Sequence, residues 1–587
     1  MNRFLEHSNI VDVIRGHARA TPQQDAVTLV PDPARPAGAQ SLSYSRLDAE
    51  ARRIAAWLQE RADPGDRVLL LYAPGLNFAA AFVACLYAGM IAVPAPLPGQ
   101  HPHQQRRIAR IAGDAGVAAL LTDSANLEAV REWARDQQVG AIACVASDDA
   151  ALGEVDAWRM PEVSRATLAL LQYTSGSTGA PKGVMISHDN LLHNADSLCR
   201  AYGLGPETRF GGWIPLFHDM GLMGLLLPAL FLGSTCILTT PNTFLKRPHL
   251  WLRMIADFRI AFTAAPNFAY DLCLQRIDDA QVAGLDLSHW RHAANGSELV
   301  QARTISAFVE RFAPLGLRAD VICPCYGMAE TTLFVSGSGA RVAPVCSVDA
   351  DLLERHRFMP SAQGARSVVS CGVVHDLDVL IVAPETREVA GAGVVGEIWL
   401  RGVSVAQGYW RHAEASARDF GACTVDGQGG YFRTGDLGVL HGGELYVTGR
   451  HKEMMIVHGR NLYPQDIERA VRAEHAELAS GAGAVFTVTA PHEEVVVTHE
   501  LRGQWCESVL PALARGIKAT VMASAGVRVS AVVLLRPGGV LRTTSGKIQR
   551  GTMRTAFLQQ SLTPMYEDVD AHLQALRHAE PVAGSVA

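Results

Sequence analysis

Two long stretches of this chain, residues 68–100 and 220–245, contain no Asp, Glu, Lys or Arg. Each is long enough to span a bilayer if charge alone is considered. Both are interrupted by residues that end or bend helices, among them Pro74, Gly89 and Pro228. The first stretch divides into a strand, a helix closed by glycine and a second strand. We therefore expect buried strand–helix–strand units in place of membrane spans.

Apolar runs of strand length alternate with longer helical patterns over most of the chain. Examples are residues 66–72, 117–123, 167–175 and 234–240. Continuous apolar strands of this kind occur in sheets that are covered on both faces, which predicts an α/β fold. Only 19% of the residues are charged, against about 25% in an average globular chain, which is consistent with large cores.

The texture of the sequence changes twice towards the C-terminus. From about residue 365 the strands become shorter and the turns rich in glycine, which predicts a β-rich subdomain over 365–451. Helical and strand patterns then return in a small α+β unit. We expect an N-terminal domain over 1–451, a C-terminal domain over 452–578 and a tail over 579–587.

Charge and cysteine content exclude several classes of protein. The net charge of −6 weighs against a partner made of nucleic acid. The 11 cysteines include no CxxC pair, which is typical of a reducing compartment. The N-terminus carries charges throughout its first sixteen residues, so we expect a cytoplasmic protein. The histidines of HEEVVVTH (492–499) are seven residues apart in a valine-rich strand, unlike the HExxH of a zinc protease.

The segment YTSGSTGAPKG (173–183) is the most informative motif. It follows an apolar strand and precedes a helical pattern over 190–202. Its glycines allow backbone N–H groups to approach a phosphate chain, and its hydroxyls and lysine add donors and charge. It is not a Walker A loop, because Pro181 precedes the lysine and Gly183 follows it. The predicted phosphate-binding residues are Thr174, Ser175, Gly176, Ser177, Thr178, Gly179 and Lys182.

Five further segments follow this loop in order. They are IPLFHDMGL (214–222), NGSEL (295–299), YGMAET (326–331), YFRTGDLG (431–438) with GRHKEMM (449–455), and TTSGKIQR (543–550). With these motifs, the chain resembles the adenylate-forming superfamily of acyl-CoA synthetases, luciferases and peptide-synthetase adenylation domains. The resemblance covers essentially the whole chain and implies that ATP activates a carboxylic acid as an acyl adenylate.

The resemblance also implies a role for each motif residue. The loop would hold the β and γ phosphates of ATP, and Glu330 would face Mg²⁺. Tyr326 would stack on adenine, and Asp436, supported by Arg450, would bind the ribose hydroxyls. Lys547 would bridge the acid and the α-phosphate. The residues expected to line the base pocket are Asn295, Gly296, Ser297 and Gly327.

Two further roles come from the same resemblance. Lys452 falls at the family's hinge, about which the C-terminal domain rotates between a pose for adenylation and a pose for thiol transfer. His218 would line the acyl pocket or gate its entrance, and a packed structural histidine remains the alternative. The apolar segments 213–232 and 261–274 are expected to line the acyl pocket.

Three features resemble the fatty acyl-AMP ligase branch. Ala329 stands where many acyl-CoA synthetases have threonine. Residues 333–371 resemble the inserted segment of that branch, which is thought to restrict domain movement and hinder the use of coenzyme A. The segment 458–468 matches the branch's motif near the hinge. An ordinary surface insertion is the alternative explanation for 333–371.

The predicted enzyme therefore forms acyl-AMP and passes the acyl group to an acyl carrier protein, for polyketide, lipopeptide or lipid biosynthesis. The carrier would be a separate chain, the enzyme a monomer, and the basic residues considered for contact with the carrier are Arg450, Lys452 and Arg460. A fatty acyl-CoA synthetase is the main alternative. An aryl or amino-acid ligase and an inactive ATP-binding scaffold are also considered.

Overall fold

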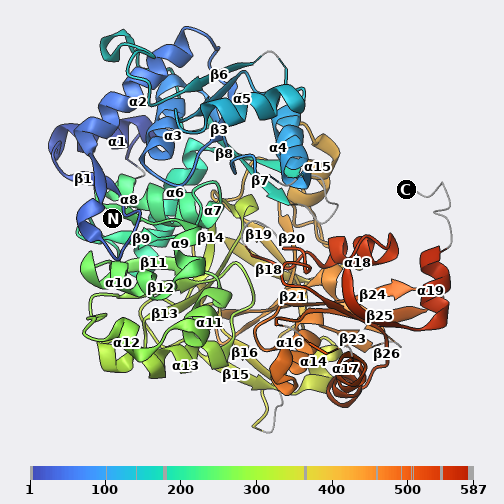
Figure 1. Ribbon diagram of the computed structural model, residues 1–587. Coiled ribbons are helices and arrows are strands. Elements are labelled where there is room, and N and C mark those ends of the chain that lie inside the picture. The colour runs from blue at the N-terminus through green and yellow to red at the C-terminus, as the bar shows by residue number, and fades with distance from the viewer. Residues whose placement is uncertain are drawn as a thin grey trace.

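The structure is a computed structural model. It describes residues 4, 6–100, 102–140, 142–175, 181–362, 366–457, 460–490, 492–503, 505–506, 508–542 and 546–578. The predicted α/β architecture is confirmed, with two large sheets in an N-terminal body and a separate small sheet near the C-terminus (Figure 1). None of the helices in the described part of the chain is long and apolar enough to cross a membrane.

The first charge-free stretch forms the middle of a six-stranded sheet. In spatial order its strands are β6 (Ala143–Ala146), β5 (Ala119–Thr122), β3 (Arg67–Leu71), β4 (Ile91–Ala95), β7 (Leu168–Ser175) and β8 (Pro181–Ser187). Between β3 and β4, helix α3 (Leu76–Ala88) ends at Gly89, whose φ of 73° is the left-handed value that glycine adopts at helix ends. The predicted strand–helix–strand unit is therefore confirmed.

Successive residues of β3 enter two different cores. Val68 and Leu70 pack with α3 and with α2 (Tyr44–Gln59) on one face. Leu69 and Leu71 pack on the other face, with α4 (Pro102–Ala115) and α5 (Leu127–Asp136). A strand that is covered on both faces leaves no position for a charged side chain. This explains why the stretch lacks charge without any membrane.

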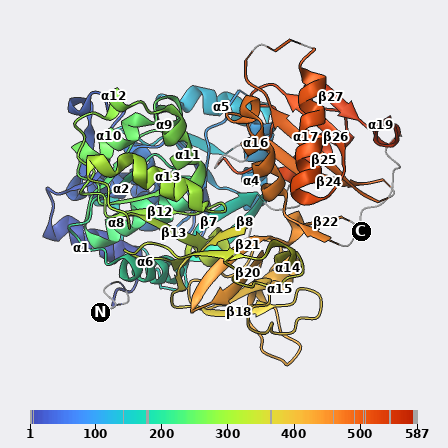
Figure 2. The ribbon, with the colours of Figure 1, turned by 90° about the horizontal axis from the view of Figure 1, so that it is seen from below.

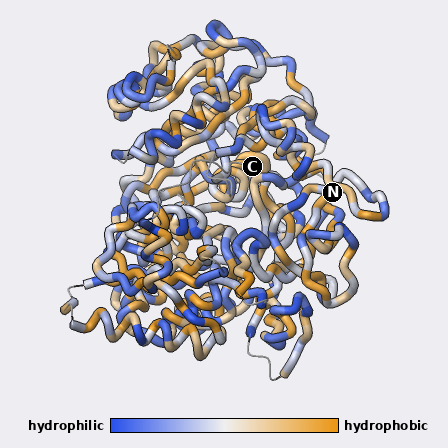
Figure 3. The backbone as a smooth tube through the Cα atoms, turned by 90° about the vertical axis from the view of Figure 1, so that its right-hand side faces the viewer, coloured by the Kyte–Doolittle hydropathy of each residue, from blue (hydrophilic) through white to orange (hydrophobic). Residues whose placement is uncertain are grey.

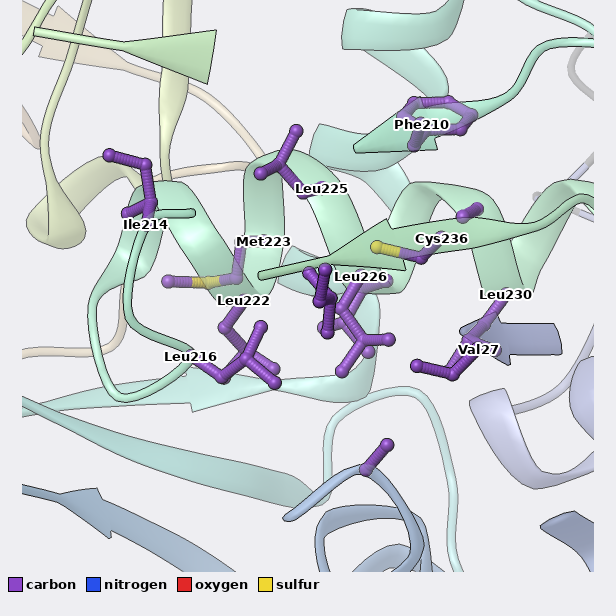
Figure 4. Packing of buried hydrophobic residues seen from close by; sticks show 14 of the residues in the cluster. Val27, Phe210, Ile214, Leu216, Leu222, Met223, Leu225, Leu226, Leu230 and Cys236 are labelled. Carbon is purple, nitrogen blue, oxygen red and sulfur yellow. The ribbon is translucent and has the colours of Figure 1, made fainter. Parts of the chain in front are cut away.

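The second charge-free stretch lies against a nine-stranded sheet. In spatial order this sheet contains β17 (Val373–Val374), β14 (Phe334–Gly337), β13 (Ile322–Gly327), β12 (His292–Asn295), β11 (Phe262–Ala265), β9 (Phe210–Gly212), β10 (Cys236–Leu238), β1 (Asp25–Leu29) and β2 (Gln40–Ser43). The stretch forms α7 (Asp219–Gly221), a π-helical turn at Leu222–Leu226 and α8 (Leu227–Leu232), and then enters β10. Its side chains interdigitate with those of neighbouring strands (Figure 4).

The glycine-rich region contains an antiparallel sheet of β18 (Asp378–Val382), β19 (Gly396–Arg401), β20 (Phe432–His441) and β21 (Glu444–Arg450). Residues 333–371 do not form one excursion, because they include β14 of the nine-stranded sheet. Beyond β14 they form β15 (Val345–Val348), α14 (Ala350–Glu354) and β16 (Arg366–Val369). The part of this segment that stands outside the main sheets therefore begins after Gly337.

The C-terminal unit has its own four-stranded sheet and lies beside the body in Figure 2. After a hairpin of β22 (Met455–Val457) and β23 (Arg460–Leu462), the sheet contains β24 (Gly483–Thr489), β25 (Glu493–Glu500), β26 (Val529–Leu535) and β27 (Pro564–Val569). One face is covered by α16 (Pro464–Glu474) and α17 (Leu510–Ala525), the other by α18 (Arg550–Leu558) and α19 (Ala571–His578).

The valine-rich run 492–499 falls on β25, and His499 is buried there. The strand prediction for this run is confirmed, and a strand cannot present two histidines as a helical HExxH does. In Figure 3, hydrophobic and hydrophilic stretches alternate along the tube. This is the pattern of elements that each have one buried face.

Candidate active site

A cavity of about 2190 Å³ lies between the N-terminal body and the C-terminal unit. The predicted site residues that line it are Thr174, Lys182, Ser297, Tyr326, Gly327, Glu330, Asp436, Arg450, Lys452 and Lys547. They come from segments far apart in the sequence. The packing of the two units brings them together.

Three predicted residues, His218, Asn295 and Gly296, are not among those that line the cavity. Asn295 ends β12 and is fully buried. A Cβ on Gly296 would lie 2.8 Å from the Sγ of Cys325, which itself lines the cavity. Asn295 and Gly296 thus support the wall from behind. Four loop residues lie outside the described residues, as does the side chain of Ser175: Gly176, Ser177, Thr178 and Gly179.

The phosphate loop joins two strands of a hairpin, whereas the sequence placed it directly before a helix. Thr174 pairs with Lys182 across β7 and β8, and α6 (His188–Tyr202) begins only after β8. The Tyr173 hydroxyl donates to Asp114 Oδ2 of α4 at 2.5 Å, which ties the base of the hairpin to that helix. Gly183 is required here, because a Cβ would lie 2.9 Å from the Tyr173 ring.

Asp436 is the centre of a fixed polar group on the body. Its side chain is buried and accepts a hydrogen bond from the Tyr326 hydroxyl at 2.8 Å. Arg450 pairs with it across β20 and β21, with Nε 3.1 Å from Oδ1. Burial and the Asp436 charge raise the pKa of Tyr326 well above its usual value. Since a carboxylate offers about four acceptor positions, Asp436 has capacity left for two ribose hydroxyls.

Glu330 faces the phosphate hairpin through Tyr409, a residue that the motif analysis missed. The Tyr409 hydroxyl donates to Glu330 Oε1 at 3.2 Å, and the Lys182 Nζ lies 4.6 Å from the centre of the Tyr409 ring. Burial raises the pKa of Glu330. Gly408, just before Tyr409, has a φ of 126°, which other residues rarely adopt. The glycine is therefore the local sequence signal that could have drawn attention to Tyr409.

His218 is mostly buried, and its neighbour Asp219 lines the cavity in its place. The Nδ1 of His218 lies 2.5 Å from Asp219 Oδ1, which also accepts from the Met220 N–H at 2.7 Å. Burial acts to raise the pKa of Asp219, but His218, Lys547 and the Met220 N–H together lower that pKa to about 2. The structure therefore places a carboxylate at this wall, paired with a histidine that does not line the cavity.

Lys547 enters the cavity from the C-terminal unit. Gly546, just before it, has a φ of 89° and packs so closely that a Cβ would lie 2.9 Å from Cε1 of Phe268 in α11 (Asn267–Arg276). Burial and the charge of Arg450 lower the pKa of Lys547, while Asp219, Asp436 and Glu298 oppose the shift. The lysine therefore lies in the field of charged groups contributed by the body.

The turn that carries Lys547 is held by ion pairs within its own unit. Arg550 lies 2.5 Å from Glu453 Oε2 and 2.8 Å from Glu468 Oε2. Because Glu453 directly follows Lys452, the predicted hinge residue, this pair joins the lysine turn to the start of the C-terminal unit.

The apolar wall of the cavity includes both predicted segments. Residues 213–232 contribute Met220 and Gly224, and residues 261–274 contribute Phe262 and Ala264. Helix α6 also contributes to this wall, through Leu198 and Tyr202, and the sequence did not indicate it. A Cβ on Gly224 would lie 3.1 Å from a methyl group of Leu333. A side chain at this position would therefore reduce the space along the apolar wall of the cavity.

Two of the basic residues considered for carrier contact are occupied by ion pairs. Arg450 pairs with Asp436, and Arg460 makes two contacts of 2.9 Å with Glu354 of α14. Arg366 of β16 also lies 2.9 Å from Asp466 of α16. Segment 333–371 is thereby attached to the C-terminal unit at two points.

Comparison with known proteins defines the class. The family model described as "AMP-binding enzyme" matches residues 14–410, and one described as "Disco-interacting protein 2-like, AMP domain" matches residues 452–567. The chain belongs to the AMP-binding enzyme family.

Particular relatives narrow the comparison. The chain is similar to the medium-chain-fatty-acid–[acyl-carrier-protein] ligase JamA of Moorena producens, with 39% identity over 89% of this chain and 90% of JamA. It is 37% identical to the long-chain-fatty-acid–AMP ligase FadD26 of Mycobacterium marinum, over 92% of this chain and 96% of FadD26. A fatty acyl-adenylate ligase from Legionella pneumophila, solved with acyl adenylate and pyrophosphate, superposes with a TM-score of 0.74 at 34% identity, covering 98% of this chain and 99% of that one.

Proposed function

We propose that this chain activates a fatty acid with ATP, forming acyl-AMP and pyrophosphate, and transfers the acyl group to the phosphopantetheine thiol of a separate acyl carrier protein. The product would enter polyketide, lipopeptide or lipid biosynthesis. The observation that carries the proposal is a single cavity that joins Asp436, Lys547 and an apolar wall. The names of JamA and FadD26 support the two half-reactions.

In the first step, a carboxylate oxygen of the fatty acid attacks the α-phosphorus of ATP, and the bond to the bridging oxygen of pyrophosphate breaks. Asp436 would hold the ribose and the phosphate hairpin the β and γ phosphates, so that the α-phosphorus is in line with the acid. Lys547 would stabilise the charge that develops on the α-phosphoryl oxygens. The alkyl chain would bind along the apolar wall, at about 0.8 kcal/mol for each buried CH₂.

The residues fit Mg²⁺ that arrives with ATP. Magnesium is commonly bound by one or two carboxylates together with substrate phosphates. Glu330 is a half-buried carboxylate that lines the cavity and contacts Tyr409, beside Lys182 of the hairpin. Magnesium would neutralise charge on the phosphates, and Glu330 would hold it there.

In the second step, the carrier thiol attacks the carbonyl carbon of acyl-AMP, AMP leaves, and the thiol proton is released. We propose that the C-terminal domain, residues 452–578, rotates about Lys452 and withdraws Lys547 for this step. The ion pairs Arg460–Glu354 and Arg366–Asp466 oppose that rotation and support a restraining role for segment 333–371. We further propose that the enzyme is cytoplasmic, because its cysteine pattern is that of a reducing compartment. We also propose that it acts as a monomer.

The test is to incubate the protein with ATP, Mg²⁺ and fatty acids of several lengths, and then to offer coenzyme A and holo carrier protein in parallel. We expect acyl-AMP in both reactions and acyl thioester only with the carrier. Efficient formation of acyl-CoA would contradict the choice of acceptor. Absence of acyl-AMP with every acid would contradict the proposal as a whole.

A further inference from the structure

Helix α4 presents three arginines, Arg106, Arg107 and Arg110, to the same cavity as the phosphate hairpin. Arg110 is four positions from Arg106 and three from Arg107, so it lies on the same side of the helix as each of them. Ile108 and Ile111 are buried and pack on the six-stranded sheet, and Arg107, four positions before Ile111, lies at the edge of this packed face. Arg106 and Arg110 are exposed and, with Arg107, line the cavity.

The topology places this face next to the phosphate hairpin. Strands β4 and β7 are parallel neighbours, and α4 begins after the carboxyl end of β4. The hairpin begins at the carboxyl end of β7, so the N-terminal half of α4 lies at the same edge of the sheet. The bond from the Tyr173 hydroxyl to Asp114 ties the C-terminal end of α4 to β7, and Arg110 is one helical turn from Asp114, about 6 Å along the axis.

In the described residues, no ion pair joins Arg106, Arg107 or Arg110 to a carboxylate, although all three line the cavity. The Nε of Arg106 donates to the Pro102 carbonyl at 3.3 Å. Arg107 is partly buried, and burial lowers its pKa without any opposing carboxylate. By contrast, Arg67, close to the same helix, pairs with Asp66 at 3.0 Å. Three adjacent cations without an anion repel one another.

We propose that Arg106, Arg107 and Arg110 form a phosphate-binding site at the mouth of the cavity, beyond the hairpin. It binds the terminal phosphates of the nucleotide and the pyrophosphate released from it. This assignment rests on the proposed function. Guanidinium groups bind phosphate oxygens in a forked geometry, which suits a polyanion without a fixed carboxylate partner. The phosphodiester of a phosphopantetheine arm has the same chemistry and is the second possible source of phosphate.

The test titrates inorganic pyrophosphate with Mg²⁺ into the full-length protein, followed by calorimetry. The variants are Arg107→Gln, Arg110→Gln and the double substitution. Arg110 is exposed, so its variant is expected to fold even if the Arg107 variant does not. We expect the double variant to raise the Kd for pyrophosphate on the order of tenfold to hundredfold, with a weaker dependence on salt.

The matched control is Arg135→Gln, an exposed arginine on the neighbouring helix α5 that does not line the cavity. Its Kd should stay within about twofold of the wild-type value. A second measurement follows acyl transfer from supplied acyl-AMP to holo carrier protein. An unchanged Kd for pyrophosphate with a raised KM for the carrier would assign the site to the phosphodiester of the arm.

If neither the Kd for pyrophosphate nor the KM for the carrier changes, the phosphate site is overturned. The titration requires no fatty acid and no turnover. Pyrophosphate binding that depends on the arginines can therefore be observed even if the chain forms no acyl-AMP, and it can be absent even if acyl-AMP forms. The failure of this inference and the failure of the proposed function are thus distinguishable.

Discussion

The Asp436 side of the cavity and the turn that carries Lys547 meet at one site, but they are held in different ways. Asp436 is fixed by direct contacts to Tyr326 and Arg450, all within the N-terminal body. Lys547 is positioned from the other unit, through Arg550 and its two glutamates, and touches the body through the close packing of Gly546 on Phe268. The Asp436 half of the site is therefore formed within the N-terminal body, whereas the Lys547 half is contributed by the C-terminal unit. This division is what a two-step enzyme needs if one group must leave between steps.

The sharpest test of this comparison is Lys547→Ala. We expect adenylation to fall by about a thousandfold, because the variant loses the positive charge that we propose stabilises the α-phosphoryl oxygens. Transfer from supplied acyl-AMP to the carrier should stay within about threefold. Pyrophosphate release and thioester formation measure the two steps. Equal loss of both would show that the lysine is not confined to the first step.

Arg550→Gln should destabilise the C-terminal unit and so weaken the half of the site that carries Lys547. It leaves Glu468, which is almost fully buried, without its cation. Breaking a buried ion pair from one side costs about 3–5 kcal/mol. Hydrogen exchange in α16 and α18 should accelerate while exchange in β3 and β4 does not. Arg550→Lys should restore part of the protection. Unchanged exchange in α16 would contradict the role of this pair.

Asp436→Asn should weaken the half of the site that lies in the N-terminal body without affecting the half that carries Lys547. Hydrogen bonds to a charged group are worth about 1.5–3 kcal/mol, so we expect the KM for ATP to rise about tenfold to hundredfold. Asp378→Asn is a matched control, because Asp378 pairs with Arg401 in the same sheet but is exposed. Steady-state kinetics with varied ATP distinguishes the two. A similar KM in both variants would argue against ribose binding by Asp436.

Gly546→Ala tests the contact between the two halves. A left-handed alanine costs about 1–2 kcal/mol, and its Cβ would also collide with Phe268. We expect adenylation to slow about tenfold, with transfer unaffected. The double variant with Phe268→Ala should recover the steric part of the loss and leave the part due to φ. Full activity of the single variant would exclude close docking of this turn.

The smallest effect concerns pH. Burial and Arg450 lower the pKa of Lys547, so its positive charge is present at low pH and is lost at a lower pH than for a free lysine. The rate of adenylation should therefore decline on the alkaline side below the usual lysine pKa. Transfer from supplied acyl-AMP should lack that decline. pH–rate profiles of both half-reactions check the difference, and identical alkaline limbs would contradict it.

Much of the fold followed from local patterns. The strands at 66–72 and 167–175, the helix closed by Gly89 and the valine-rich β25 were all predicted, because continuous apolar runs and helix-ending glycines are local signals. The motifs also indicated most of the cavity lining, including Asp436 and Lys547. Such residues stand in short, glycine-marked turns whose composition is unusual by itself.

Other parts of the site left no signal that a single sequence reveals. In HDMG, Asp219 lines the cavity and His218, which pairs with it, does not. Tyr409 and Tyr202 reach the cavity from segments that were assigned no functional role. The strand β8 after the phosphate loop was missed because its pairing partner β7 decides its conformation.

The sequence by itself determined the α/β class, the order of the motifs and the chemistry that their side chains can perform. The tertiary structure decided which of those side chains face one cavity and that Arg450 and Arg460 are engaged by carboxylates. It also decided that, within the described part of the chain, no carboxylate pairs with the three arginines of α4. The physical reason is the distance along the chain over which each kind of interaction acts. Hydrophobic periodicity and turn chemistry act over a few residues, whereas burial, ion pairing and the direction of a side chain depend on segments hundreds of residues away.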